Sequence, residues 1–171
     1  MDALKSKIRH VPDFPKPGIL FYDITTLLRD AEGLTQAINA LSEPYLSAGI
    51  ELVVGIESRG FILGAAVADR LGCGFVPVRK VGKLPAATVR ATYDLEYGSD
   101  SLEMHADAIE PGQRVLIVDD LLATGGTARA TVGLVKKVGG VVTGIAFLIE
   151  LVDLHGRKGL AGEHVQVVLQ Y

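Results

Sequence analysis

Two adjacent carboxylates and a short run of threonines and glycines stand together in the second half of the chain. Asp119 and Asp120 are followed shortly by Thr-Gly-Gly-Thr at residues 124–127. Glycine N–H groups and threonine hydroxyls together make a concave, donor-rich surface that fits a phosphate. The carboxylates would repel that phosphate, so they must face a vicinal diol or a hydrated cation. A sugar phosphate carries both kinds of group at the required separation.

A buried strand and a helix are expected to position these groups. Residues 115–118 form a short apolar run, which is typical of a parallel-sheet strand covered on both faces, and the two aspartates are expected to end it. Residues 127–138 show helical spacing of apolar side chains, with lysines near the end. The Thr-Gly-Gly-Thr run therefore lies at a helix N-terminus, which favours an anion. An ordinary capped turn is the alternative, although a cap needs only one acidic residue.

A second candidate anion site follows another apolar strand. Glu57-Ser58-Arg59-Gly60 comes after the strand at 52–56 and opens an Ala-rich helix at 59–71. Ligands of open α/β sheets bind beyond the carboxyl ends of the strands, so two such turns on one edge could hold both ends of a long anion. A surface salt bridge is an equally good role for Arg59 on the sequence alone.

A basic segment with glycine and proline could close over the same anion. Arg79, Lys80 and Lys83 stand in a stretch that also contains Gly82 and Pro85. A mobile loop of this kind would exclude water from a reactive sugar cation. A solvated surface loop is the alternative from charge alone.

The chain length indicates one domain, and the N-terminal sequence and hydropathy lead us to expect a cytoplasmic protein. The 171 residues are enough to bury about 70% of the unfolded surface in one core. An apolar share of 49% and a mean hydropathy of +0.33 could also cover a subunit interface. The net charge of -3 argues against a nucleic-acid or membrane partner. A single cysteine, Cys73, excludes an internal disulfide, and we find no signal peptide or membrane span. The four histidines have no metal-ligand spacing.

The remaining patterns predict alternating strands and helices. A short helix at 2–9 precedes a proline-rich arm, and a helix at 32–48 should be kinked or ended by Pro44. Further strands are expected at 75–78, 141–151 and 165–169, with an antiparallel pair at 92–97 and 101–105. The fold class is therefore α/β, with a central, mostly parallel sheet flanked by helices.

The run from Val115 to Thr127 resembles the phosphoribosyl pyrophosphate (PRPP) signature of type I phosphoribosyltransferases. The resemblance implies that fold over residues 1–171 as a single domain, with an N-terminal hood at 1–30 and a flexible lid loop and hairpin at 79–105. It implies Mg²⁺ as cofactor, held mainly through the substrate, and a homodimer in which Arg79 reaches the neighbouring site. Glu-Ser-Arg-Gly-Phe at 57–61 resembles the family's pyrophosphate loop, which often has a non-proline cis peptide.

The implied contacts divide by the part of the substrate they hold. The 5′-phosphate is assigned to Ala123, Thr124, Gly125, Gly126 and Thr127, and the ribose hydroxyls to Asp119 and Asp120. The pyrophosphate is assigned to Ser58, Arg59, Arg79, Lys80 and Lys83.

Within the family, the segment Phe-Pro-Lys-Pro-Gly-Ile-x-Phe-x-Asp-Ile-Thr at 14–25 and Leu-Glu-Tyr-Gly at 95–98 are similar to the adenine-specific members. This similarity implies a base site made by Leu20, Phe21, Tyr22 and Leu151, in which Leu151 packs opposite Phe21. Many members have Arg at the position of Tyr22. It also implies that Glu96 is the catalytic acid/base, a role that typically contributes 10²–10⁴-fold in rate.

The expected reaction is adenine plus PRPP giving AMP and pyrophosphate. Two alternatives stay open on the sequence. One is the same chemistry on another purine, such as xanthine. The other is a PRPP-sensing regulator, which should carry a nucleic-acid-binding module or a basic face.

Overall fold

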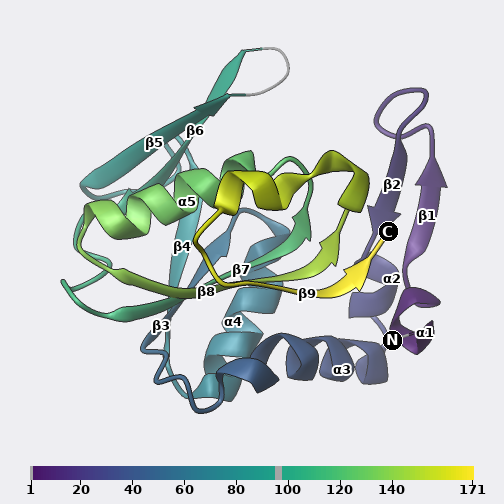
Figure 1. Ribbon diagram of the computed structural model, residues 1–171, viewed down its shortest axis with the longest axis horizontal. Coiled ribbons are helices and arrows are strands. Elements are labelled where there is room, and N and C mark those ends of the chain that lie inside the picture. The colour runs from purple at the N-terminus through teal and green to yellow at the C-terminus, as the bar shows by residue number, and fades with distance from the viewer. Residues whose placement is uncertain (1, 95–97) are drawn as a thin grey trace.

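Seven strands form the central sheet in the part of the chain that this computed structural model describes, residues 2–94 and 98–171 (Figure 1). Their order is β5-β6-β4-β3-β7-β8-β9. The strands from β4 to β9 in this order run parallel, whereas β6 runs antiparallel to β4 and β5 antiparallel to β6. The predicted α/β class and mostly parallel sheet are confirmed. The bounds are β3 Leu52–Ile56, β4 Gly74–Lys80, β5 Thr88–Asp94, β6 Ser99–His105, β7 Arg114–Leu122, β8 Val141–Glu150 and β9 Val165–Gln170.

Helices cover both faces of this sheet. Figure 1 shows α3 and α4 on one face and α5 on the other, next to the short 3₁₀ turn η3. The helical bounds are α1 Asp2–Lys5, α2 Thr25–Leu28, α3 Ala31–Ser42, α4 Arg59–Leu71 and α5 Gly126–Lys137, with 3₁₀ turns η1 Glu43–Tyr45, η2 Val152–Leu154 and η3 Gly156–Leu160. None of the helices in the described ranges is long and apolar enough to cross a membrane.

The apolar run of β7 supplies both cores, because successive side chains of a strand point to opposite faces. Leu116 and Val118 pack into the core on the α3 and α4 side. Val115 and Ile117 pack into the second core, under α5. All four are fully buried. Burying a side chain of this size contributes about 1.5–3 kcal/mol, so β7 is held firmly at the centre of the sheet.

The structure corrects one prediction about β7. Asp119 and Asp120 were expected to end the strand, but β7 continues through both to Leu122. The reason is its neighbour β8, which pairs Phe147 with Asp119 and Ile149 with Leu121. Sheet hydrogen bonding carries the backbone past the two charges and fixes them rigidly.

Two helix predictions have different outcomes. The helix expected at 59–71 is observed at Arg59–Leu71. The helix expected at 32–48 ends at Ser42, and Pro44 lies just beyond it in η1, as a residue that cannot continue an α-helix should.

The lid hairpin, β5–β6, is longer than expected. Pairing runs from Thr88 opposite His105 to Asp94 opposite Ser99, so β5 begins four residues before the predicted start at 92. Residues 95–97 lie outside the described ranges. The hairpin joins the parallel sheet through β6, which pairs with the end of β4 at Arg79 and Lys80 among the described residues.

The N-terminal hood is a small sheet of its own. The helix predicted at 2–9 ends at Lys5, and Arg9 already opens β1 (Arg9–Pro12), which pairs antiparallel with β2 (Leu20–Asp23). An ion pair between Arg9 and Asp23 joins the two strands. The ring of Tyr22 packs against that of Tyr171 with the centroids 4.3 Å apart, which docks the hood on the end of β9.

Candidate active site

The polar segments identified in the sequence meet at one edge of the sheet. The parallel strands β4, β3 and β7 are neighbours, so their carboxyl ends lie side by side. From β3 the chain crosses through α4 to β4 on one side, and from β7 through α5 to β8 on the other. The boundary between β3 and β7 is therefore the topological switch point, where open α/β sheets bind ligands. The peptide bond between Glu57 and Ser58, just after β3, is cis, as the resemblance implies.

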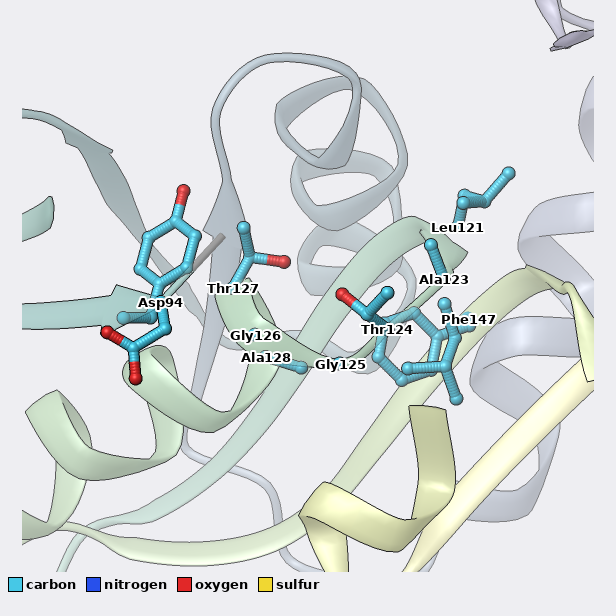
Figure 2. Close-up of a pocket in the computed structure, with 11 residues that line it drawn as sticks. Asp94, Leu121, Ala123, Thr124, Gly125, Gly126, Thr127, Ala128 and Phe147 are labelled. Atoms are coloured by element: carbon cyan, nitrogen blue, oxygen red, sulfur yellow. The ribbon is translucent and has the colours of Figure 1, made fainter. Parts of the chain in front are cut away.

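The Thr-Gly-Gly-Thr run lines a cavity of about 160 Å³ at the N-terminus of α5 (Figure 2). Gly125 is the N-cap of this helix and has φ +84°, a left-handed conformation that favours glycine. Figure 2 shows the hydroxyls of Thr124 and Thr127 pointing into the space between them. The cavity therefore combines the N–H groups at the start of α5 with two hydroxyl donors, a combination suited to a phosphate. The lining consists of Tyr93, Asp94, Leu121, Leu122, Ala123, Thr124, Gly125, Gly126, Thr127, Ala128 and Phe147.

The two aspartates are buried beside this cavity. Asp119 is 8% exposed and Asp120 6% exposed. Burial, and then the charge of Asp120, raises the pKa of Asp119 well above its ordinary value. The first turn of α4 approaches closely because Gly60 has no side chain: a Cβ there would lie 2.7 Å from Asp119 Oδ1. The acidic pair thus lies directly against the turn that follows β3.

Arg59 connects this acidic pair to the hood. Its Nε lies 2.6 Å from Asp120 Oδ2, and a third of its side chain is exposed. The guanidinium carbon is also 5.2 Å from the centre of the Phe21 ring, within cation–π range. Arg59 therefore lies between an aromatic side chain of β2 and a carboxylate of β7. The sequence left two roles open for Arg59, a surface salt bridge and a ligand contact. In the structure the partner of Arg59 is a buried carboxylate.

The basic segment is held by carboxylates of the same chain. Arg79 Nε lies 3.2 Å from Glu57 Oε2, and the Lys80 N–H donates to the same oxygen at 2.9 Å. Although burial opposes it, these hydrogen bonds hold the pKa of Glu57 below its usual value. Lys83 contributes its carbonyl, which accepts from Arg79 Nη1 at 3.3 Å.

The ammonium of Lys80 is held by the lid hairpin. It donates to the Asp100 carboxylate and, at 3.1 Å, to the Tyr93 hydroxyl. Burial works to lower the pKa of Lys80, but these hydrogen bonds raise it above the usual value. An incoming anion must therefore compete with Asp100, Glu57 and Asp120 for three of the predicted cations.

The residues expected around the base divide between the two faces of β2. Leu20 and Tyr22 line a cavity of about 620 Å³ between the hood and the C-terminal segment, together with Leu151 from the end of β8. Phe21 alternates to the other face, where it meets Arg59 and the ring of Phe14. The structure brings Leu20, Tyr22 and Leu151 together and places Phe21 next to the acidic pair. The complete lining of the cavity is Lys16, Gly18, Ile19, Leu20, Tyr22, Leu151, Asp153, Leu154 and Tyr171.

Some predicted and some unexpected residues complete the site. Glu96, the predicted acid/base, lies outside the described residues. Sequence reasoning missed Tyr93 and Phe147, which line the phosphate cavity, because both belong to apolar patterns that indicate core. Ser58 is exposed at the turn before α4 and makes no side-chain cap there.

Comparisons with known proteins identify a matching family and similar structures. The model of the phosphoribosyl transferase domain family matches residues 21–165. The adenine phosphoribosyltransferase of Acidobacterium capsulatum is 62% identical over 170 residues, which cover 99% of this chain and 94% of the relative. The crystal structure of the adenine phosphoribosyltransferase from Rhodothermus marinus superposes with a TM-score of 0.96 at 60% identity, with 99% of this chain and 97% of that chain covered.

A third similar protein has been solved with a base bound. The adenine phosphoribosyltransferase of Saccharomyces cerevisiae, complexed with an imino-altritol bisphosphate and adenine, superposes with a TM-score of 0.93 at 41% identity. The match covers 98% of this chain and 97% of that chain.

Proposed function

This chain belongs to the adenine phosphoribosyltransferase family, and we propose that it transfers the phosphoribosyl group of PRPP to adenine, forming AMP and pyrophosphate, as a purine-salvage enzyme. Its relatives carry the adenine name at 56–62% identity, which favours adenine over xanthine as the base. The position of Asp119 and Asp120 on the central strand β7 supports the proposal, because a transferase needs its site residues on rigid elements.

The single observation that carries the proposal is the position of the Arg59–Asp120 ion pair. It lies between the hood residue Phe21 and the strand that leads into the phosphate loop at 123–127. A base at the hood, a ribose at the acidic pair and a 5′-phosphate in the loop would follow one another in the order of their covalent connection in AMP. The lid segment with Arg79, Lys80 and Lys83 would bind the pyrophosphate, on the side of the ribose that neither the base nor the 5′-phosphate uses.

The acidic pair supplies the electrostatic part of the reaction. Departure of pyrophosphate leaves positive charge on the ribose, and carboxylates fixed beneath it stabilise that charge. A nearby positive charge favours the ionised form of a carboxyl group. The raised pKa of Asp119 therefore makes its ionisation responsive to the charge that develops on the sugar.

Arg59 can contact the acidic pair and the leaving pyrophosphate at the same time. The guanidinium has five N–H donors in a planar fork, so Nε can keep Asp120 while the Nη groups bind phosphate oxygens. Lys80 and Lys83 add positive charge for the leaving pyrophosphate. Closure of the lid over them would exclude water from the sugar cation.

Magnesium is proposed as cofactor, held mainly through the substrate. In residues 2–94 and 98–171, no group of three or more His, Cys, Asp or Glu side chains is arranged to hold a metal. Mg²⁺ commonly binds through one or two carboxylates, waters and substrate phosphates. The carboxylates of Asp119 and Asp120 have the hard oxygen atoms that this ion prefers, and they lie at the edge of the sheet where the substrate is proposed to bind. The ion would neutralise the charge of the pyrophosphate.

The base specificity is tested with purified protein and PRPP. We expect AMP formation from adenine, and much slower or no turnover of xanthine and hypoxanthine. Turnover of xanthine without turnover of adenine would overturn the assignment. PRPP binding without any transfer to a purine base would favour the regulator.

The acid/base assignment of Glu96 is tested by Glu96→Gln, which keeps the shape but cannot take up a proton at neutral pH. We expect the turnover rate to fall about 10²–10⁴-fold. Glu110→Gln is the matched control, since Glu110 is exposed and lies away from the sheet edge that carries the site. An undiminished rate in Glu96→Gln would contradict the assignment while leaving the substrate unchanged.

The phosphate loop is tested by Thr127→Ala, which removes one of the two hydroxyls shown in Figure 2. Loss of a hydrogen bond to a charged group costs about 1.5–3 kcal/mol, so the KM for PRPP should rise roughly 10–100-fold. The control is Thr35→Ala on the exposed surface of α3. The same KM for PRPP in both variants would exclude Thr127 from the phosphate site.

A homodimer is also proposed. Ile62 of α4 is 50% exposed and Val81, just after β4, is 42% exposed. Ile62 follows Phe61 in the sequence, and the Phe61 ring lies 5.9 Å from the Arg79 guanidinium. Light scattering should give twice the mass of the chain for the parent, and Ile62→Asp should dissociate it, whereas Leu46→Asp, at a similarly exposed site, should not. A monomeric parent would refute the proposal.

The cytoplasmic location stays a prediction, tested by cell fractionation.

A further inference from the structure

The phosphate loop at 123–127 packs closely against a second segment, which the sequence pattern did not link to the loop. This segment is η3, which begins at Gly156 and follows β8 after the short turn η2. A Cβ added to Gly125 of the loop would lie 2.5 Å from the Gly156 carbonyl oxygen. A Cβ added to Gly156 would lie 2.3 Å from the Ala123 carbonyl oxygen. The two backbones therefore fit together through the missing side chains of two glycines.

The close approach at Gly156 is steric and does not depend on its own backbone conformation. Only Gly125 of this pair has positive φ. Alanine at 156 would meet the carbonyl of Ala123 and also Leu122, whose Cδ1 lies 2.9 Å from the added Cβ. Both neighbours belong to the strand end and loop, so the extra atom must move either the loop or η3.

Other contacts hold η3 in place, so the loop is the part expected to yield. Arg157 Nε donates to Glu150 Oε1 at 2.7 Å, and Arg157 Nη1 donates to the Val165 carbonyl at 3.1 Å. Glu150 is 3% exposed and also accepts from Gln170. Leu160, at the end of η3, is buried in the core under α5. The segment is thus fixed to β8, β9 and the core.

We propose that Gly156 is a positioning residue for the 5′-phosphate site. Its backbone fixes the position and orientation of residues 123–126, and through them the direction of the N–H groups at the start of α5. Gly156 itself does not line the phosphate cavity. The inference rests on the proposed function only for the names of the substrates. The affinity of any ligand with a 5′-phosphate would reveal a displaced phosphate loop.

The test is Gly156→Ala, compared with two glycine variants that separate position from stability. Gly144→Ala places a Cβ 2.6 Å from the Tyr45 ring, a clash on β8 away from the loop. Gly159→Ala lies in η3 but meets nothing closer than Arg129 Nη1 at 3.8 Å. The measurements are the dissociation constants of AMP and adenine, the KM for PRPP, and the melting temperature.

We expect Gly156→Ala to weaken AMP binding and raise the KM for PRPP roughly 10–100-fold, because misplacement of a binding group by about 1 Å has effects of this size. Adenine binding should be unchanged. Gly144→Ala should lower the melting temperature without changing AMP affinity, and Gly159→Ala should change neither.

Unchanged AMP affinity in Gly156→Ala would overturn the proposal, as would equal loss of AMP affinity in Gly144→Ala. If Gly156→Ala does not fold, Arg157→Lys decides. Arg157→Lys should loosen η3, because lysine cannot keep both the contact with Glu150 and the contact with the Val165 carbonyl. An AMP affinity equal to that of the parent would then overturn the proposal. Absence of AMP formation by the parent would refute the proposed function, whereas the ratio of AMP affinities between variant and parent tests Gly156 alone.

Discussion

Replacing Arg59 by glutamine should destabilise the protein even without substrate. The guanidinium lies 2.6 Å from a carboxylate that is 6% exposed. Two unit charges at that distance attract by roughly 6 kcal/mol at an effective dielectric constant of 20, most of which offsets the cost of burying them. Removing one partner of a buried pair typically costs 3–5 kcal/mol. Because a third of the Arg59 side chain is exposed, we expect a loss of about 3 kcal/mol.

The assay is thermal and urea unfolding of the parent, Arg59→Gln, Asp120→Asn and the double variant. A loss of this size should lower the melting temperature by roughly 6–12 °C in a chain of this length. The double variant should recover most of the loss, since no buried charge is then left without its partner.

Lys136→Gln provides the matched control for this prediction. Lys136 pairs with Glu163 at 2.5 Å, but its side chain is 57% exposed. An exposed pair contributes about 0.2–1 kcal/mol. If Arg59→Gln costs no more than Lys136→Gln, the reasoning from burial is refuted and Arg59 behaves as an ordinary surface cation.

Two further predictions concern single carboxylates. Asp119→Asn should stabilise the protein at neutral pH and lower the turnover rate about 10²–10³-fold, because it removes a buried charge that the reaction uses. Since the folded-state pKa of Asp119 is raised, the cost of its ionisation is absent below its ordinary pKa near 4 and grows as the pH rises, so unfolding curves of parent and variant should converge at about pH 4. Asp30→Ala should cost about 1 kcal/mol in urea unfolding, because the Asp30 carboxylate caps α3 by accepting from the Gly33 N–H at 2.7 Å. An unchanged unfolding midpoint would contradict that role.

Local pattern was sufficient for much of the fold. The helix at Arg59–Leu71 was predicted to the residue because its apolar period and its terminal Gly72 are local signals. The extent of β7 was not, because its continuation through Asp119 and Asp120 depends on pairing with β8, far away in the sequence. Hairpin β5–β6 was placed too short for a different reason, because its exposed face carries no hydrophobic period that would mark where the strands begin.

The site shows the same division between local and distant signals. The loop at 123–127 and the acidic pair could be recognised because their chemistry lies in consecutive residues. The pairing of Arg59 with Asp120 could not be read from the sequence, where both residues also suit a surface. Gly156 gave no signal at all, because the reason for a glycine there is the carbonyl of Ala123, which only the folded chain brings near.

The narrow connection between the hairpin β5–β6 and the parallel sheet has a consequence for amide exchange. Among the described residues, β6 meets β4 in register only at Arg79 and Lys80, whereas β7 pairs with β3 from Val115 to Val118 and with β8 from Arg114 to Leu122. Amides of β7 should therefore exchange with solvent through global unfolding, and those of the hairpin through a separate, sub-global opening of lower free energy. The lid can then move as its own cooperative unit while the strands that carry the acidic pair stay closed.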